Sequence, residues 1–146
     1  MRNFFNRLRA SAYWVSSLKM ASDERYEAAL QRIGKLEEIK PGNVEVTLLK
    51  AFLYFSSDKD KPALDGFLKG WRLIEESDEY SLDEKKYLQC YASFYGQKLV
   101  HTTESNGHHP FSVDYANVDL DKVRGALKDN FPLKDHPQWP GNRVER

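Results

Sequence analysis

An internal period constrains this chain more than any other feature of its sequence. A shift of 34 residues places Ala29 on Ala63 and carries Leu18 onto Phe52. Further matches at the same shift are Leu30 with Leu64, Ile33 with Phe67, Leu36 with Gly70, Ile39 with Leu73, Ser17 with Ala51 and Met20 with Tyr54. Self-similarity at a fixed period of this length indicates a repeated supersecondary unit. A plain helical bundle whose hairpins share a period is the alternative.

The hydrophobic pattern within and beyond the repeat is helical. Apolar residues recur at steps of three and four, and polar turn clusters separate them, which predicts five or six helices. The expected helices cover about 26–39, 44–55, 60–74, 82–100 and 119–130, after a first helix in the basic N-terminal segment. Their expected N-terminal caps are Ser22 or Asp23, Asn43, Ser81 with Glu84 as a capping box, and Asp119.

Two of these helices carry further packing information. The segment 44–55 is apolar almost all round, so we expect it to be the central and most buried helix. Gly66 and Gly70 lie one turn apart in the next helix. Because each glycine costs about 1 kcal/mol relative to alanine in a helix, the pair predicts that a neighbouring helix backbone packs closely there.

A period of 34 residues with two helices per unit resembles the tetratricopeptide repeat. The small residues Ala29 and Ala63, the aromatic Tyr13 early in the first helix and Pro41 at the end of the first unit fit this family. The resemblance covers about residues 10–95 and implies stacked antiparallel helical hairpins.

The sequence departs from the family pattern at three places. Thr47 stands where the second unit should have an aromatic residue, and Leu36 where the first unit should have a small one. Glu75 replaces the closing proline of the second unit, and the third unit is recognisable only in its first helix, from Leu82.

The whole chain, 1–146, is long enough for a single domain. We predict an all-α fold with four parts: hairpins over 10–100, a loop over 101–118, a short helix over 119–130 and an irregular tail over 131–146. Whether this tail covers the helical groove is open.

Composition excludes several functions. The 22 Lys and Arg residues balance the 22 Asp and Glu residues, so the chain lacks the positive field of a nucleic-acid-binding protein. Cys90 is the single cysteine, so a disulfide within one chain and a Cys-rich zinc site are excluded. A reducing compartment, and hence a cytoplasmic location, fits best.

The first twenty residues are basic and amphipathic, with Arg2, Arg7, Arg9 and Lys19 among aromatic and aliphatic residues. This pattern suits a packed first helix, which the repeat favours from Tyr13 onward. A membrane-surface helix or an organelle-targeting segment is the alternative. Apolar runs of about 18 residues, as in a membrane span, are not found in the sequence.

Candidate chemistry is sparse. His101, His108 and His109 lie in or beside a predicted loop, which leaves a metal-dependent or hydrolytic protein as an alternative. They lack a recognised metal-ligand spacing, and the sequence has no Gly-rich phosphate loop or nucleophile elbow. We therefore predict a protein that is not an enzyme and that has no cofactor or metal.

The leading functional hypothesis is a protein-binding module, narrowed to a dedicated inhibitor or immunity-type protein that masks one partner such as a toxin. This rests on what stacked hairpins commonly do. A dense acidic stretch predicts a basic partner, and the groove of the repeat predicts apolar contacts. The expected partner-binding residues are Glu75, Glu76, Asp78, Glu79, Trp14, Leu18, Phe52 and Phe55. The identity of the partner and the oligomeric state do not follow from the sequence.

Overall fold

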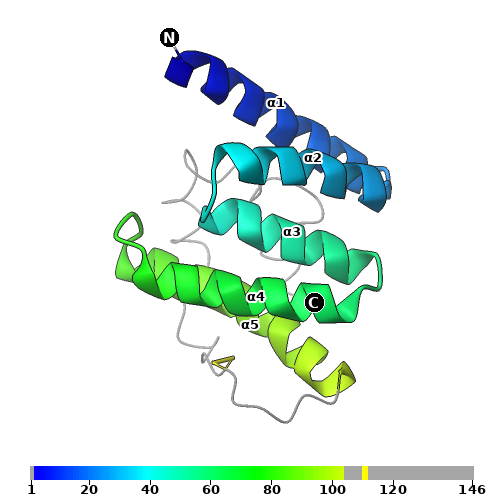
Figure 1. Cartoon of the computed structure of the whole chain (residues 1–146). Coiled ribbons are helices and arrows are strands. Elements are labelled where there is room, and N and C mark those ends of the chain that lie inside the picture. The colour runs from blue at the N-terminus through cyan, green and yellow to red at the C-terminus, as the bar shows by residue number, and fades with distance from the viewer. Residues whose placement is uncertain (1, 104–109, 112–146) are drawn as a thin grey trace.

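A computed structural model of the chain describes residues 2–103 and 110–111, and these residues are helical with no strand (Figure 1). The five helices are α1 (Arg2–Ser22), α2 (Tyr26–Ile39), α3 (Val44–Ser56), α4 (Asp60–Glu76) and α5 (Leu82–Thr102). The predicted all-α fold is confirmed. The predicted helix over 119–130 and the tail over 131–146 lie outside the described residues, as does most of the predicted loop over 101–118.

Successive helices pack as a stack of antiparallel hairpins. Each helix packs on the next along the chain, and Figure 1 shows α2, α3 and α4 side by side with alternating directions. α5 lies against α4 and also reaches α3 through aromatic contacts. The contacts of α1 with α2 and of α3 with α4 are more extensive than those of α2 with α3, so the helices pack as pairs.

The turns within the two hairpins are copies of each other. Glu24, between α1 and α2, has φ 62°, and Asp58, between α3 and α4, has the same value. The residue after each donates its N–H to the carbonyl five residues back, and each of the two itself donates to the carbonyl three back. This pattern is a Schellman motif with a left-handed residue that is not glycine. The two positions differ by 34, so the period governs the backbone as well as the sequence.

This turn corrects the predicted start of α2. Ser22 belongs to α1 and Asp23 to the turn, so neither caps α2; Arg25 occupies the cap position without a side-chain hydrogen bond. The reason is that the Schellman motif ends α1 and begins α2 within one tight connection, which leaves no room for a separate capping residue.

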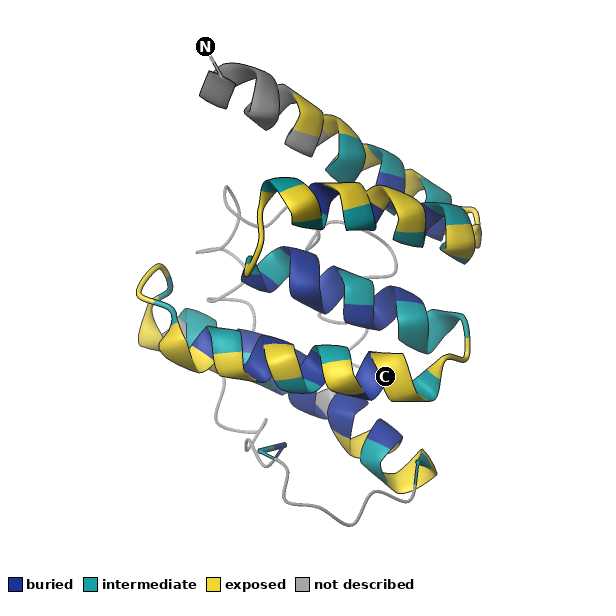
Figure 2. Cartoon of the chain, in the orientation of Figure 1, coloured by how far each residue is buried: buried dark blue, intermediate teal, exposed yellow. Residues whose placement is uncertain are grey.

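The centre of the core is α3, as expected from its composition. Figure 2 shows α3 as the most continuously buried helix in the view. Its buried residues are Val44, Val46, Thr47, Leu48, Leu49, Ala51, Phe52 and Leu53. The predicted cap is confirmed, because the Asn43 side chain accepts a hydrogen bond from the Val46 N–H at 3.0 Å. The preceding turn passes through Gly42 at φ 72°, a conformation that suits glycine.

The glycine pair of α4 marks the predicted close approach. A methyl group on Gly66 would lie 2.8 Å from the Ala51 Cβ and 3.2 Å from the Ala51 Cα. A methyl group on Gly70 would lie 2.7 Å from a Leu48 methyl carbon. Gly66 therefore allows the α4 backbone to approach the α3 backbone, and Gly70 leaves room for the Leu48 side chain, which explains two residues that weaken an isolated helix.

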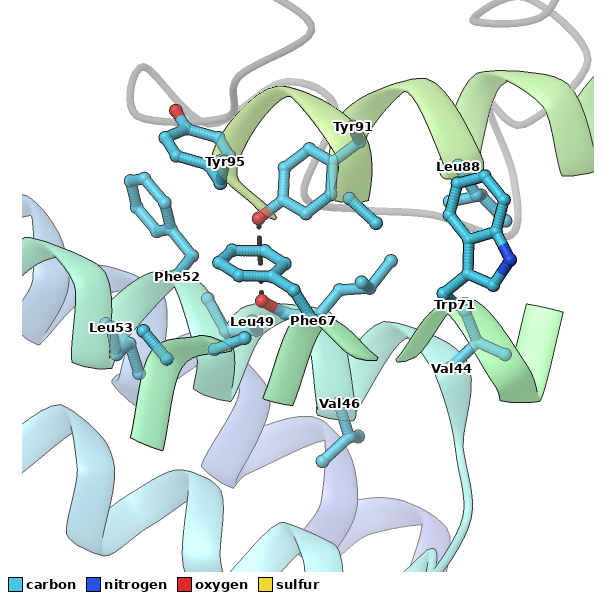
Figure 3. Packing of buried hydrophobic residues seen from close by; sticks show 14 of the residues in the cluster. Val44, Val46, Leu49, Phe52, Leu53, Phe67, Trp71, Leu88, Tyr91 and Tyr95 are labelled. Atoms are coloured by element: carbon cyan, nitrogen blue, oxygen red, sulfur yellow. Dashed lines mark hydrogen bonds between the residues drawn. The ribbon is translucent and has the colours of Figure 1, made fainter. Parts of the chain in front are cut away.

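α5 closes this side of the core with aromatic rings (Figure 3). The Tyr95 ring stacks on the Phe67 ring of α4 with centroids 5.5 Å apart and an interplanar angle of 9°. The capping box at its start is present: Ser81 accepts from the Glu84 N–H, and Glu84 accepts from the Ser81 N–H. α5 runs to Thr102, two residues beyond the expected end.

After α5 the chain returns to the core at Phe111, which is 1% exposed. Its ring meets Trp71 edge to face at 5.9 Å between centroids and lies against Gly96, where any side chain would collide with it. The Gln97 side chain donates a hydrogen bond to the Phe111 carbonyl. Phe111 therefore fixes the chain against the outer face of α4 and α5.

Candidate functional site

The acidic stretch divides into residues that serve the fold and residues that face solvent. Glu75 is exposed, but its carboxylate accepts a hydrogen bond from the Trp71 indole N–H at 2.8 Å. Its backbone carbonyl also accepts from the Lys85 ammonium at 3.3 Å. Glu75 therefore helps to hold the end of α4, and its contact with a partner would compete with these bonds.

Glu76, Asp78 and Glu79 are exposed, and within residues 2–103 and 110–111 their carboxylates have no cationic partner. We call these three residues the acidic surface. They border an open recess of about 480 Å³ between the end of α4 and the α2–α3 connection, with Lys40 on the opposite rim. Carboxylates that cluster without ion pairs attract cations over a distance set by the ionic strength.

Beside this surface lies a contact that the sequence did not reveal. The Tyr80 hydroxyl donates a hydrogen bond to a Glu45 carboxylate oxygen at 3.0 Å, across 35 residues of sequence. Burial raises the pKa of Glu45 to about 7, and the nearby Glu79 adds to the rise, against smaller lowering effects from Tyr80 and Lys40. Burial and Glu45 also raise the pKa of Tyr80, so its hydroxyl stays a donor at neutral pH.

The two α1 residues predicted to make apolar contacts with a partner are partly accessible to solvent. Trp14 and Leu18 are half-buried and pack against the core, while Val15 beside them is 62% exposed. The Trp14 indole nitrogen is buried and finds no acceptor among the described residues. A buried donor of this kind costs stability until it is paired.

The other two predicted apolar residues are occupied within the chain. Phe52 is only 6% exposed, and its ring meets Tyr95 edge to face at 5.6 Å between centroids. Phe55 is half-buried and meets the same Tyr95 ring at 4.7 Å. Figure 3 shows Phe52 and Tyr95 facing each other across the α3–α5 contact. Both rings therefore stabilise the core, and Phe52 offers little surface to a partner, whereas part of Phe55 stays exposed.

The acidic and apolar sets do not form one site. Figure 1 shows α1 at one end of the stack and the α4–α5 connection at the other, with α2 and α3 between them. The described structure therefore places the acidic residues and the α1 residues Trp14 and Leu18 at opposite ends of the stack, with Phe52 buried between them.

Of the three histidines that suggested a metal-dependent or hydrolytic protein, the structure describes one. His101 is exposed on the last turn of α5, while His108 and His109 lie outside the described residues. Within the described part of the chain, His, Cys, Asp and Glu side chains form no group of three suited to a metal ion. The described helices also lack any segment with the length and apolarity needed to cross a bilayer.

No protein-family model, curated protein or solved structure matches this chain.

Proposed function

We propose that this chain is a small protein-binding module of tetratricopeptide-like architecture. The observation that carries the proposal is the repeated hairpin turn, with Glu24 and Asp58 in the same left-handed conformation 34 residues apart. Stacks of such hairpins present an extended, preformed surface, and protein recognition is the use to which it is most often put. This last step is an analogy at the level of the fold.

The acidic surface is the part of the described structure best suited to bind a partner protein. Glu76, Asp78 and Glu79 are exposed, lie together at the end of α4 and in the connection that follows, and have no cationic partner in the described structure. Such a surface favours a basic segment, because complementary charge speeds encounter and fixes orientation. In its narrower form the proposal is a dedicated inhibitor or immunity-type protein that masks one basic protein, such as a toxin, inside the cytoplasm.

A pull-down with the tagged full chain tests the proposal. We expect one stoichiometric partner, and we expect the variant Glu76→Lys, Asp78→Lys, Glu79→Lys to lose it by at least about tenfold in affinity. The matched control reverses the same number of charges elsewhere, at the exposed residues Asp23, Glu38 and Asp65. The control should keep the partner.

Two results would contradict the proposal. Equal loss in the variant and in its control would show a response to net charge, and not to the acidic surface. Micromolar binding of many unrelated peptides would argue against a single dedicated partner. A bound metal in the purified chain would redirect attention to the histidines.

A further inference from the structure

The charges of α1 are all of one sign. The helix contains Arg2, Arg7, Arg9 and Lys19, and the first acidic residue of the chain is Asp23, which follows the helix. α1 therefore holds four of the 22 basic residues and none of the 22 acidic ones, so the rest of the chain is acidic on balance. A chain without net charge thus concentrates positive charge on one helix at the end of the described stack.

The face of α1 that points away from the core combines cations with aliphatic side chains. Arg9, Ala12, Val15 and Lys19 recur at steps of three and four residues and are exposed, whereas Ala21 on the opposite face is buried. Within the described part of the chain, neither Arg9 nor Lys19 forms an ion pair. Both cations are therefore available to a ligand on this face.

The exposed face of the neighbouring helix shows that a water-facing helix in this chain has a different pattern. On α2, the exposed residues Glu27, Arg32, Lys35 and Glu38 carry charges of both signs. Mixed charges of this kind are typical of a helix face that meets only solvent. A face that meets only water needs neither a single sign of charge nor exposed aliphatic side chains, so contact with solvent does not explain the pattern of α1.

The position of α1 leaves this face open among the described helices. α1 has 21 residues and α2 has 14, and a tight turn joins them as an antiparallel pair. The first turns of α1 therefore extend past the end of α2 by roughly 10 Å, as Figure 1 shows. A flat surface approaching the outer face of α1 meets this helix before any other described helix.

We propose that α1 binds the surface of a membrane that contains anionic phospholipids. Arg9 and Lys19 contact the phosphate groups, and Val15 enters the boundary between headgroups and acyl chains. Val15 and Ala12 favour lipid over nucleic acid, because aliphatic side chains offer no aromatic surface on which bases stack. The acidic surface lies at the other end of the stack (Figure 1) and stays accessible to a partner protein.

Co-sedimentation of the full chain with vesicles tests the inference. We expect the chain to bind vesicles of phosphatidylcholine with phosphatidylserine, to bind phosphatidylcholine alone more weakly, and to be released by raised ionic strength. The variant Arg9→Gln, Lys19→Gln should weaken binding at least about tenfold. The matched control, Lys69→Gln, Arg72→Gln, removes the same two types of cation from exposed positions of α4 and should change binding less than about twofold.

The variant Val15→Ser separates lipid binding from attraction to anions in general. It keeps every charge and should weaken vesicle binding about fivefold, because an aliphatic side chain no longer enters the headgroup boundary. Urea unfolding should show that these variants keep the fold, since the changed residues are exposed.

Four results would overturn the inference. The first two are no binding to the mixed vesicles and an equal loss in the α4 control. The third is binding to single-stranded RNA in place of vesicles, which would assign the face to nucleic acid. The fourth is sedimentation of the chain without vesicles that is lost in the α1 variant, which would assign the face to a second copy of the chain. None of these tests involves the partner of the acidic surface, so the inference and the proposed function can fail separately.

Discussion

The two hairpins place different residues at the same positions of the repeat. On α3, Val46, Leu49 and Leu53 form one face and are buried to 2% exposure or less. The residues 34 positions earlier on α1 are Ala12, Val15 and Lys19, all of them exposed. Figure 3 shows Val46 pointing toward the first hairpin, whereas α1 packs chiefly on α2 and forms one end of the described stack.

The repeat therefore specifies the backbone, while the neighbouring unit decides which side chains must be apolar. A terminal helix of a stacked repeat needs a polar outer face. Lys19, which stands where the second hairpin has the buried Leu53, supplies a charge on this face, whereas Ala12 and Val15 leave part of it apolar and exposed. The burial of a residue in one unit therefore does not predict the burial of the matching residue in the other unit, because the neighbouring helices differ.

The largest expected effect comes from truncation at one repeat position in both hairpins. Leu49→Ala should lower the free energy of unfolding by about 3 kcal/mol, because a fully buried side chain leaves a cavity. Val15→Ala should change it by less than about 0.5 kcal/mol, since the side chain is exposed and alanine favours the helix. Urea unfolding followed by circular dichroism measures both. Equal losses would show that α1 has a covered outer face.

A smaller effect should appear at the glycines. Gly66→Ala places a methyl group against the α3 backbone and should cost about 1 to 2 kcal/mol after the gain in helix propensity. Gly34→Ala, with open space around the new methyl group, should instead stabilise by up to about 1 kcal/mol.

A double-mutant cycle sharpens this contrast. Ala51→Gly should recover part of the Gly66→Ala loss, because the two methyl groups collide with each other. The same denaturation experiment provides the coupling energy. Additive losses in the double variant would place the strain elsewhere in the α3–α4 contact.

The smallest effect concerns the two turns. Glu24→Gly and Asp58→Gly each remove a side chain from a left-handed conformation. Each should stabilise the chain by up to about 1 kcal/mol, and this gain is reduced because glycine also raises the conformational entropy of the unfolded state. The sharper expectation is that the two values agree within about 0.3 kcal/mol, because the turns are copies. Thermal unfolding of the two variants side by side makes the comparison. A clear disagreement would show that neighbouring units act on the turns as well.

Much of the architecture could be predicted from residues with a strong local preference. Asn43 and the Ser81–Glu84 box act as caps because their side chains bond to backbone groups a few residues away. Gly66 and Gly70 revealed a close helix contact because glycine is otherwise unfavourable in a helix. These signals require no knowledge of the rest of the fold.

Features that depend on distant partners were not predictable in the same way. Tyr80 and Glu45 are 35 residues apart, and each has an ordinary surface role when considered alone. Phe52 and Phe55 were expected near a groove, and their packing against the Tyr95 ring of α5, which buries Phe52 and leaves Phe55 half-buried, could not be read from their own positions in the sequence. Left-handed Glu24 and Asp58 escaped prediction because glycine normally signals that conformation.

The close approach at Gly66 has a mechanical consequence. The α3–α4 seam is stiff, because sliding would drive backbone atoms into each other. The α2–α3 seam is held by side chains and by the ion pair of Lys50 with Glu37, and a second pair, Lys59 with Glu27, joins α2 to the α3–α4 connection. Long flexible side chains of this kind can adjust to small displacements. We expect the stack to bend between α2 and α3, so that the first hairpin swings as a unit against a rigid remainder.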